Sequence, residues 1–546
     1  MDRIYFDRDT SKLKKTPFGI FVDQAGYTPE RRKVAVLPFE AESFTVVDED
    51  GSTVFLGKTA FFGFDKSSGD TVYTADFSEL SREGTYRVTA DGKSSAAFRI
   101  DGNVYANVFR ETAKAFYFLR CGCELTEEYA GKYVHAPCHT APAVLFEDRN
   151  VTLDVSGGWH DAGDYGRYVT AGACAAAHLL YAYKLFPDVF DKLKLNIPNG
   201  GLPDILTEVR YELEWLLKMQ RADGAVYHKA TTMTHAPFVM PEDDTDQMIV
   251  FPASSMAAAD LCAVSALASE IYLPFDRDFS ERLLKAAEKS AEWLDNNPDF
   301  LDFRNPEGCN TGGYYEWNDH SNRYWAYAEM YSATGDKAYY EKMKSLLNRN
   351  FPLAELGYSE VGGLGSLAYL LSHREKDEYT AVLLKKAFAD RADDLKALSD
   401  GSGYGVALPF EGYHWGSNMS VMKHGMIFAI NDLINGDSAS REYAARQLDY
   451  LLGTNALGIS YVTGTGEFRV NEPHLRPAFA DGIDECIPGM VSGGANSGLN
   501  DPFAQAVIEK GTPPMKCFAD DPASYSMNEI TIYWNSPTVF VLAYLM

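Results

Sequence analysis

Cysteine is scarce in this chain of 546 residues, and basic residues are outnumbered by acidic ones. The eight cysteines stand mostly isolated, which argues against a disulfide scaffold and suggests buried thiols or metal ligands. Lys and Arg total 50 against 77 Asp and Glu, which gives a formal net charge of -27. A surface this negative repels nucleic acid phosphates and anionic lipid, so we expect neither nucleic acid nor membrane partners.

Long hydrophobic runs are also missing. No stretch reaches the roughly 20 apolar residues of a membrane helix, and the run at 538–546 is too short. The first residues, MDRIYFDRDTSKLKK, carry charges throughout and lack the apolar centre of a secretory signal. We therefore expect a cytoplasmic protein if this N-terminus is native, and a secreted one if a signal peptide has been removed.

Two kinds of patterning divide the chain. Between about 18 and 100, short alternating apolar runs such as those at 18–22, 44–47 and 85–90 are separated by turn signals, which predicts a sandwich of about seven strands. After residue 104, segments of helical periodicity follow one another, and a dozen helices would fit a barrel of paired helices. We predict a mainly α protein, with a β-sandwich at 17–101 and a helical domain at 102–546.

The most informative loop, DVSGGWHDAGDYGRYVTAG, lies at 154–172 and places Asp161 and Asp164 three residues apart. Two carboxylates so close cannot both be buried and charged without compensation. One interpretation is a helix N-cap pair, because Asp accepts from the exposed N–H groups there. The glycines and aromatic residues around them favour a binding loop instead, since glycine lets a ligand approach the backbone and aromatic rings stack on sugars.

A second acidic element lies near the C-terminus, where Glu529 stands between Asn528 and Ile530. A surface Glu is usually solvated and carries no function. Here the apolar residues that follow would raise the pKa of Glu529 toward that of a proton donor. A carboxylic acid that protonates the leaving oxygen, with a carboxylate that activates water, is the pair that glycoside hydrolysis requires.

The chain resembles glycoside hydrolase family 9, in the cellulase and cellodextrinase subgroup with an N-terminal immunoglobulin-like domain. The resemblance covers essentially the whole chain from about residue 18, and four blocks carry it: GWHDAGDYGRYV at 158–169, WGSN at 415–418, LLGTNALGISYVTGTG at 451–466 and YSMNEITIYWNSP at 525–537. It implies that an (α/α)6-barrel catalytic domain follows the sandwich along the chain. It also implies that Asp164 is the catalytic base, that Asp161 helps to hold the nucleophilic water, and that Glu529 is the general acid of an inverting reaction.

The resemblance also implies that His474 and Arg476 bind the sugar next to the scissile bond. The chain departs from many relatives at Glu467-Phe468-Arg469 and at His474-Leu475-Arg476, which puts the sugar contacts on the non-reducing side in doubt.

Aromatic residues in polar loops are candidate sugar platforms. We expect this role for Trp415, Tyr525 and Trp317, although a place in the core is an equal alternative for Trp317. Trp215 and Trp293 fall inside amphipathic helices, where we expect core positions.

A separate group of residues has the donors of a tetrahedral zinc site: Cys121, Cys138, His139 and His160. Buried thiols and ordinary histidines are the alternative, because the spacing alone is irregular. Since zinc at matching positions is common in the family, we expect a structural zinc, with Cys123 as a substitute ligand nearby. Calcium is kept open without assigned ligands, because the acidic run at 242–246 fits a solvated loop better. We expect no organic cofactor.

These observations predict an inverting hydrolase of β-1,4-glucosidic bonds in soluble β-glucans or cello-oligosaccharides, endo or exo, as a monomer or dimer. One alternative on the same fold is an exo-acting β-glucosaminidase or β-glucosidase, since the net charge of -27 favours a cationic substrate. Another is a glycan-binding protein without activity, against which the presence of both Asp164 and Glu529 argues.

Overall fold

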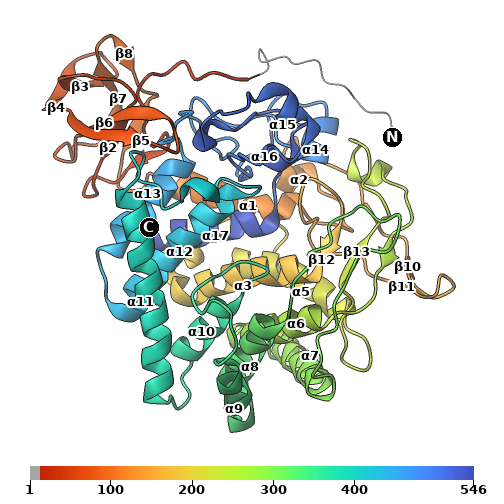
Figure 1. Ribbon diagram of the computed structural model, residues 1–546. Helices are drawn as coiled ribbons and strands as arrows, with labels where there is room; N and C mark the ends of the chain where they lie inside the picture. The colour runs from red at the N-terminus through yellow and green to blue at the C-terminus, as the bar shows by residue number, and fades with distance from the viewer. Residues whose placement is uncertain (1–12) are drawn as a thin grey trace. The chain divides into compact units, whose positions relative to one another are not determined.

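The computed structural model describes residues 13–546, so most of the charged N-terminal segment lies outside the described residues. The chain divides into two compact units, Met1–Ala115 with Ala392–Met546 and Phe116–Arg391. Strands dominate the chain up to Ile100 and helices dominate the rest, as predicted (Figure 1). Within the described part of the chain, no helix combines the length and apolar character that crossing a membrane requires.

The N-terminal region is a two-sheet sandwich. One sheet has the order β1-β9-β7-β3-β4, with β8 paired to β7, and the other has the order β2-β6-β5. Alternate side chains of the strands point inward, as in β7, where Tyr86, Val88 and Ala90 are buried. The strands are Gly26–Tyr27, Val34–Leu37, Ser43–Asp48, Thr53–Lys58, Ala60–Asp65, Asp70–Asp76, Gly84–Ala90, Lys93–Ser94 and Phe98–Ile100, β1 to β9 in order.

Two details of the sandwich differ from the sequence prediction. The run at 18–22 forms only isolated bridges, through Ile20 and Phe21. Strands β4 and β5 were not predicted, because large apolar residues such as Leu56 and Phe64 lie on their exposed side and obscure the usual alternation.

The helical region alternates two kinds of helix along the chain. Nearly all side chains are buried in the first kind, whereas the second kind has an exposed face. The mostly buried helices are α3 (Val169–Leu185), α6 (Ser255–Tyr272), α8 (His320–Thr334), α10 (Gly362–Leu371), α12 (Ser417–Asn435) and α17 (Ile532–Leu545). The helices with an exposed face are α1 (Ala106–Phe118), α5 (Asp204–Lys218), α7 (Arg277–Asn296), α9 (Lys337–Leu346), α11 (Glu378–Asp400) and α13 (Ser440–Leu451). This alternation of inner and outer helices is the pattern of an (α/α)6 barrel.

Helix packing follows the same order inside each unit. In Phe116–Arg391, α3 packs on α6, α6 on α8 and α8 on α10, while α5, α7 and α9 pack on these inner helices (Figure 1). In the other unit, α12 packs on α13 and α17. Small residues make close packing possible, as in the segments ACAAA of α3 and MAAAD of α6.

Short elements connect the long helices. They are α2 (Glu127–Ala130), α4 (Pro187–Lys192), α14 (Arg476–Ala480), α15 (Pro502–Val507) and α16 (Tyr525–Asn528). Five short strands in Phe116–Arg391 form a sheet of order β11-β10-β14-β13-β12, which the sequence did not predict. They are β10 (Ala143–Leu145), β11 (Thr152–Leu153), β12 (Arg167–Tyr168), β13 (Lys229–Thr231) and β14 (Ile249–Val250).

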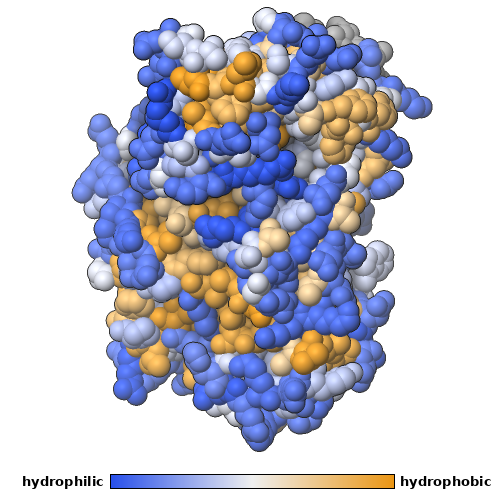
Figure 2. Space-filling model, turned by 90° about the vertical axis from the view of Figure 1, so that its left-hand side faces the viewer, coloured by the Kyte–Doolittle hydropathy of each residue, from blue (hydrophilic) through white to orange (hydrophobic). Residues whose placement is uncertain are grey.

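The surface is mostly hydrophilic on the face drawn in Figure 2, with several separate hydrophobic patches. This fits the high content of acidic residues in the sequence. On the sandwich, Phe61 and Phe64 of β5 are both about two-thirds exposed, at 66% and 68%.

Gln24 ties the sandwich to the loop at 453–468 within their shared unit. Its side-chain nitrogen donates to the carbonyls of Gly458 at 3.0 Å and Phe468 at 2.9 Å, and its oxygen accepts from the Phe468 amide at 2.9 Å. Nearby, Arg31 donates to Asp449 of α13 at 2.6 Å. Buried polar contacts of this kind depend on both partners, because each group left alone would be unsatisfied.

The first prediction concerns this contact. We expect Gln24→Ala to destabilise the protein by about 2–3 kcal/mol, because the buried Gly458 carbonyl and the half-buried Phe468 amide both lose their hydrogen bonds to this side chain. Thermal unfolding followed by circular dichroism would measure the change. Gln505→Ala, which removes an exposed side chain with one hydrogen bond, is the matched control. Equal midpoints for the two variants would contradict the prediction.

Candidate active site and metal-binding group

The loop with Asp161 and Asp164 lies directly before β12 and α3. Helix α3 begins at Val169 and its N-cap is Tyr168, with no side-chain cap. The interpretation of the two aspartates as an N-cap pair is therefore wrong: strand β12 separates them from the helix, because Arg167 and Tyr168 pair with β13 instead of entering α3.

Both aspartates are buried, with exposures of 2% for Asp161 and 6% for Asp164. The Tyr314 hydroxyl donates to Asp161 Oδ2. Asp164 Oδ2 accepts from the Tyr168 hydroxyl at 3.1 Å and lies 3.2 Å from His235 Nδ1. Buried carboxylates require donors of this kind to remain charged, so the surroundings compensate for the burial.

Tyr168 remains a proton donor in this position. Its hydroxyl is buried, and burial together with the charges of Asp164 and Asp161 raises the pKa of Tyr168 well above its usual value. The same oxygen accepts from the Gly312 amide at 2.9 Å, so its proton is directed at Asp164.

The turn between the aspartates and β12 needs glycine at 166. The Asp161 amide donates to the Gly166 carbonyl at 2.9 Å, which folds the loop back on itself. A Cβ atom at Gly166 would lie 2.6 Å from the Tyr168 hydroxyl and 2.8 Å from Asp164 Oδ2, closer than real Cβ contacts. Any side chain at this position would therefore displace both groups.

Helix α5 holds the preceding turn through two carboxylates. Glu212 accepts from the Trp159 amide at 2.7 Å, and Glu208 accepts from the Trp159 indole at 2.8 Å. Arg120 forms a bidentate ion pair with Glu208, with nitrogen–oxygen distances of 2.9 to 3.2 Å. Burial raises the pKa of Glu212 to about 8. The backbone and the side chain of Trp159 are thus both fixed directly before His160 and Asp161.

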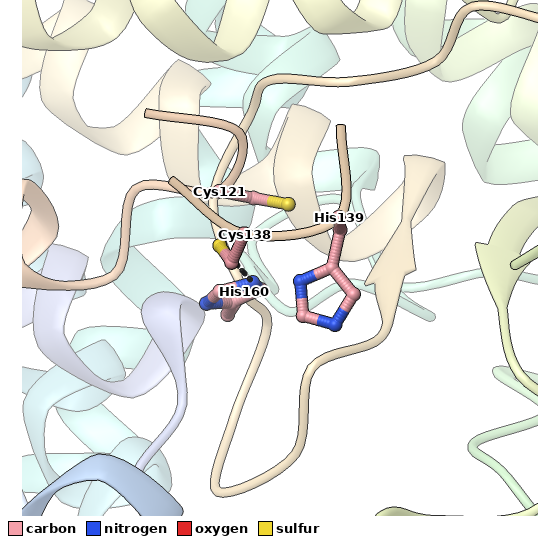
Figure 3. Close-up of side chains that lie close together, drawn as sticks. All are labelled: Cys121, Cys138, His139 and His160. Carbon is pink, nitrogen blue, oxygen red and sulfur yellow. Dashed lines mark hydrogen bonds between the residues drawn. The ribbon is translucent and has the colours of Figure 1, made fainter. Parts of the chain in front are cut away.

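The four predicted metal ligands come together in the same unit. One ligand atom from each of Cys121, Cys138, His139 and His160 lies within 4.8 Å of the others. Figure 3 shows the four side chains directed toward a common point, with Cys138 Sγ 3.9 Å from His160 Nε2. Two thiols and two imidazoles at this spacing fit a tetrahedral metal ion.

The environment of His139 also fits a metal. Its Nε2 lies 3.2 Å from Asp244 Oδ2, and its Nδ1 is buried with no hydrogen-bond partner. A carboxylate on one ring nitrogen, with the other nitrogen directed at the ion, is the usual arrangement of a metal-bound histidine. Cys123 is not a member of the group.

Two carboxylates of the acidic run at 242–246 contact the loop that carries Cys138 and His139. Asp244 contacts His139, and Glu242 Oε1 accepts from the Ala136 amide at 3.1 Å. Both carboxylates therefore hold the loop that carries Cys138 and His139. The description of the run as a solvated loop was wrong for Asp244, whose side chain is only 4% exposed.

Glu529 lies in the other unit, directly after α16. Its backbone forms a bridge with His474, and its carbonyl accepts from the Gly493 amide at 2.9 Å. The neighbouring Asn528 side chain accepts from Ser492 at 2.9 Å and donates to Asp520 at 3.1 Å. The Glu529 side chain is half-buried, so it can reach solvent from a fixed backbone.

Two of the predicted sugar-binding residues of this unit, Trp415 and His474, lie beside a third, Tyr525. Its ring lies 5.3 Å from that of Trp415 and 6.0 Å from that of His474. His474 Nδ1 contacts the Pro522 carbonyl at 2.6 Å, and both His474 and Arg476 are buried. Trp415 is 41% exposed, so its ring is accessible.

Trp317 lies in the unit that contains the two aspartates. Its side chain is 92% exposed, so the alternative of a core position is wrong. Of the two tryptophans expected in the core, Trp215 is buried and Trp293 is only partly buried.

The departure at Glu467 has a structural explanation. Glu467 pairs with Arg87 of the sandwich at 2.6 Å and accepts from the Ala97 amide at 3.3 Å. This residue therefore joins two parts of its own unit.

Sequence reasoning missed three residues that contact the aspartates, Tyr168, Tyr314 and His235. Tyr168 belongs to the quoted block at 158–169, but nothing in the pattern distinguished it from its neighbours. Tyr314 and His235 lie about 70 to 150 residues further along, in loops without a specific motif. Of the three, only Tyr168 lies in a strand of the five-stranded sheet, whereas Tyr314 and His235 reach the aspartates from loops.

Comparison with known proteins agrees with this arrangement. The family model described as glycosyl hydrolase family 9 matches residues 105–542, and the model of the cellulase N-terminal ig-like domain matches 15–95. The chain is 45% identical over 543 residues to a cellodextrinase of Butyrivibrio fibrisolvens, covering 96% of this chain and 99% of that protein. It is 35% identical to endoglucanase D of Acetivibrio thermocellus, over 96% and 83% of the two chains.

Solved structures give the same result. A mutant thermostable endoglucanase from Alicyclobacillus acidocaldarius matches with a TM-score of 0.92 at 35% identity, over 97% of this chain and 99% of that one. A zinc-binding triple mutant of a family 9 endoglucanase matches with a TM-score of 0.90 at 35% identity, over 94% and 99%. The chain is a glycoside hydrolase and belongs to glycosyl hydrolase family 9.

Proposed function

We propose that the protein hydrolyses β-1,4-glucosidic bonds in soluble β-glucans and short cello-oligosaccharides, with inversion at the anomeric carbon. The observation that carries the proposal is the buried pair Asp161 and Asp164, with a hydrogen-bond donor on each carboxylate. The likeness to a cellodextrinase over nearly the whole of both chains supports the choice of short substrates.

On the base side, Asp164 removes a proton from water while Asp161 helps to orient the same water molecule. The water oxygen bonds to the anomeric carbon from the face opposite the leaving group, so the configuration inverts. Tyr168 and His235 hold Asp164 and Tyr314 holds Asp161, which leaves the carboxylates little freedom to turn.

On the acid side, Glu529 gives its proton to the departing glycosidic oxygen as the bond to carbon breaks. The backbone contacts to His474 and Gly493 fix the position from which the carboxyl extends. His474 and Arg476 bind the sugar beside the scissile bond, and the rings of Trp415 and Tyr525 stack on sugar faces.

The group of Cys121, Cys138, His139 and His160 would hold a structural zinc ion. Four protein ligands leave no open coordination position, so the ion supplies cross-linking rather than chemistry. Since His160 directly precedes Asp161, the ion fixes the loop that carries both aspartates.

The experiment that tests the function is a time course on cellohexaose and on a chitosan hexamer, with products separated by length and the first anomer identified by NMR. We expect cleavage of cellohexaose, with the α-anomer formed first. Early dimers to tetramers would indicate endo action, whereas glucose with its pentamer would indicate exo action. Glucosamine from the chitosan hexamer alone would instead establish the glucosaminidase alternative.

Two variants serve as controls for this experiment. Glu529→Gln and Asp164→Ala should each lower turnover by roughly 10²- to 10⁴-fold, the usual contribution of a catalytic acid or base, while the oligosaccharide still binds. If either variant retained most of its activity, the assignment of that residue would be wrong.

A further prediction concerns Tyr314. We expect Tyr314→Phe to lower kcat by roughly 10- to 100-fold, because the Asp161 carboxylate loses the hydrogen bond that the Tyr314 hydroxyl donates to it. Steady-state kinetics on cellohexaose would measure the effect. Tyr315→Phe is the matched control, since the Tyr315 hydroxyl accepts a long hydrogen bond from the Asn305 amide, at 3.4 Å, and the ring is 45% exposed. A wild-type kcat for Tyr314→Phe would overturn the role of this contact.

The zinc site generates another prediction. We expect the purified protein to hold one zinc ion per chain, and removal by a chelator or by Cys138→Ser to lower both the melting temperature and kcat. Elemental analysis and thermal unfolding would measure these changes. Cys123→Ser should retain the metal, because Cys123 lies outside the group of four. A metal-free protein with an unchanged melting temperature in chelator would exclude the site.

A further inference from the structure

Lys229 is a buried lysine that the mechanism above does not use. It opens β13, lies directly opposite Tyr168 of β12, and has no exposed surface. A buried ammonium group is costly unless all its protons are bonded. Its place beside Tyr168 connects it to the region of Asp164.

The ammonium group of Lys229 is fully satisfied by a single loop. It donates to Asn305 Oδ1 at 2.7 Å, to Thr311 Oγ1 at 2.9 Å and to the Gly312 carbonyl at 2.7 Å, and Cys309 Sγ of the same loop lies 3.6 Å from it. Three oxygen acceptors match the three protons of the group. The Phe251 ring lies 4.5 Å from the same nitrogen and excludes water on that side.

This loop continues directly to Asp164. The Gly312 amide donates to the Tyr168 hydroxyl at 2.9 Å, and that hydroxyl donates to Asp164 Oδ2 at 3.1 Å. Lys229 holds the carbonyl of the same Gly312 residue. A Cβ atom at Gly312 would lie 3.0 Å from the Tyr168 ring, so the loop and the ring are in close contact.

His228 strengthens the same connection from the neighbouring position. Burial lowers the pKa of His228 to about 3, so the ring is neutral at pH 7. Its Nε2 donates to the Gly313 carbonyl at 2.9 Å, and Ser254 donates to its Nδ1 at 2.9 Å. Two consecutive residues of the β13 region thus hold two consecutive carbonyls, those of Gly312 and Gly313.

Charge also links Lys229 to the aspartate. Burial lowers the pKa of Lys229 to about 8, and this shift is opposed first by the neighbouring Cys309 and, to a lesser degree, by the attraction of Asp164. The group therefore remains mostly protonated at neutral pH. Since the attraction is mutual, the lysine favours the ionised form of Asp164, the form that can accept a proton from water.

We propose that Lys229 is a positioning residue for the catalytic base: it fixes the segment Asn305–Gly312, through which Tyr168 is directed at Asp164. The inference rests on the proposed role of Asp164. Lys229 acts through Gly312 and Tyr168, so it serves the reaction without contact to substrate. His235, Tyr168 and the Gly166 amide also contact Asp164, and Asp161 lies nearby in the same loop.

The test compares Lys229→Met with the wild type in kcat, KM and the pH profile of kcat/KM on cellohexaose. We expect kcat to fall roughly 10- to 100-fold, as for a misplaced catalytic group, with a much smaller change in KM. The acid limb of the profile should move to higher pH, because Asp164 loses a nearby positive charge. Lys229→Arg keeps the charge and should restore the acid limb.

Lys33→Met is the matched control, since Lys33 is also fully buried and donates to two carbonyls within the sandwich, those of Pro29 and Arg31. We expect it to leave kcat and the pH profile unchanged. Lys229→Met with the kinetics of Lys33→Met would overturn the inference. Asp164→Ala, measured in the same assay, distinguishes failure of this inference from failure of the proposed function. If Asp164→Ala is active, the proposed function itself is wrong.

If Lys229→Met fails to fold, Tyr168→Phe tests the same connection to Asp164. This variant removes the hydroxyl that lies between the Gly312 amide and Asp164. We expect the same fall in kcat and the same movement of the acid limb. A Tyr168→Phe enzyme with wild-type kcat and pH profile would overturn the inference.

Discussion

The burial of two carboxylates three residues apart is the constraint on which this site depends. Asp161 and Asp164 are almost inaccessible to solvent, and neither could stay charged there without donors. Tyr168 and Tyr314 donate hydrogen bonds to them, His235 lies 3.2 Å from Asp164, and Lys229 adds a positive charge that attracts Asp164. A small sheet and the long loops beside it bring these groups to the aspartates, whereas the helices supply the frame.

The loop itself is held from both sides. Before the aspartates, α5 fixes Trp159 through two carboxylates, and the group of two cysteines and two histidines includes His160. After them, the pairing of β12 with β13 fixes Tyr168. A catalytic group must stay within a fraction of an ångström of its working position, so rigid support on both sides is a physical requirement of this kind of chemistry.

Polar contacts join the sandwich to a loop of the helical region. Gln24 and Arg87 of the sandwich hold the loop at 453–468, and Glu467, which departs from the usual family pattern, is one of their partners. The sandwich therefore supports the segment that leads to His474 and Glu529. These contacts are directional hydrogen bonds and an ion pair. They therefore fix the position of the loop more than they bury apolar surface.

The sequence by itself determined the family and the order of a β-sandwich and paired helices, and it named Asp161, Asp164 and Glu529 as candidate catalytic residues and four residues as candidate metal ligands, which the structure brings together. It could do so because these residues stand in short, dense blocks, and because helical periodicity is local. Only the tertiary structure decided that β12 excludes the N-cap interpretation, that Trp317 is exposed, that Tyr314 and His235 contact the aspartates, and that Lys229 lies opposite Tyr168. The groups that contact a buried charge are those close to it in the folded chain. A local sequence pattern contains no information about that distance.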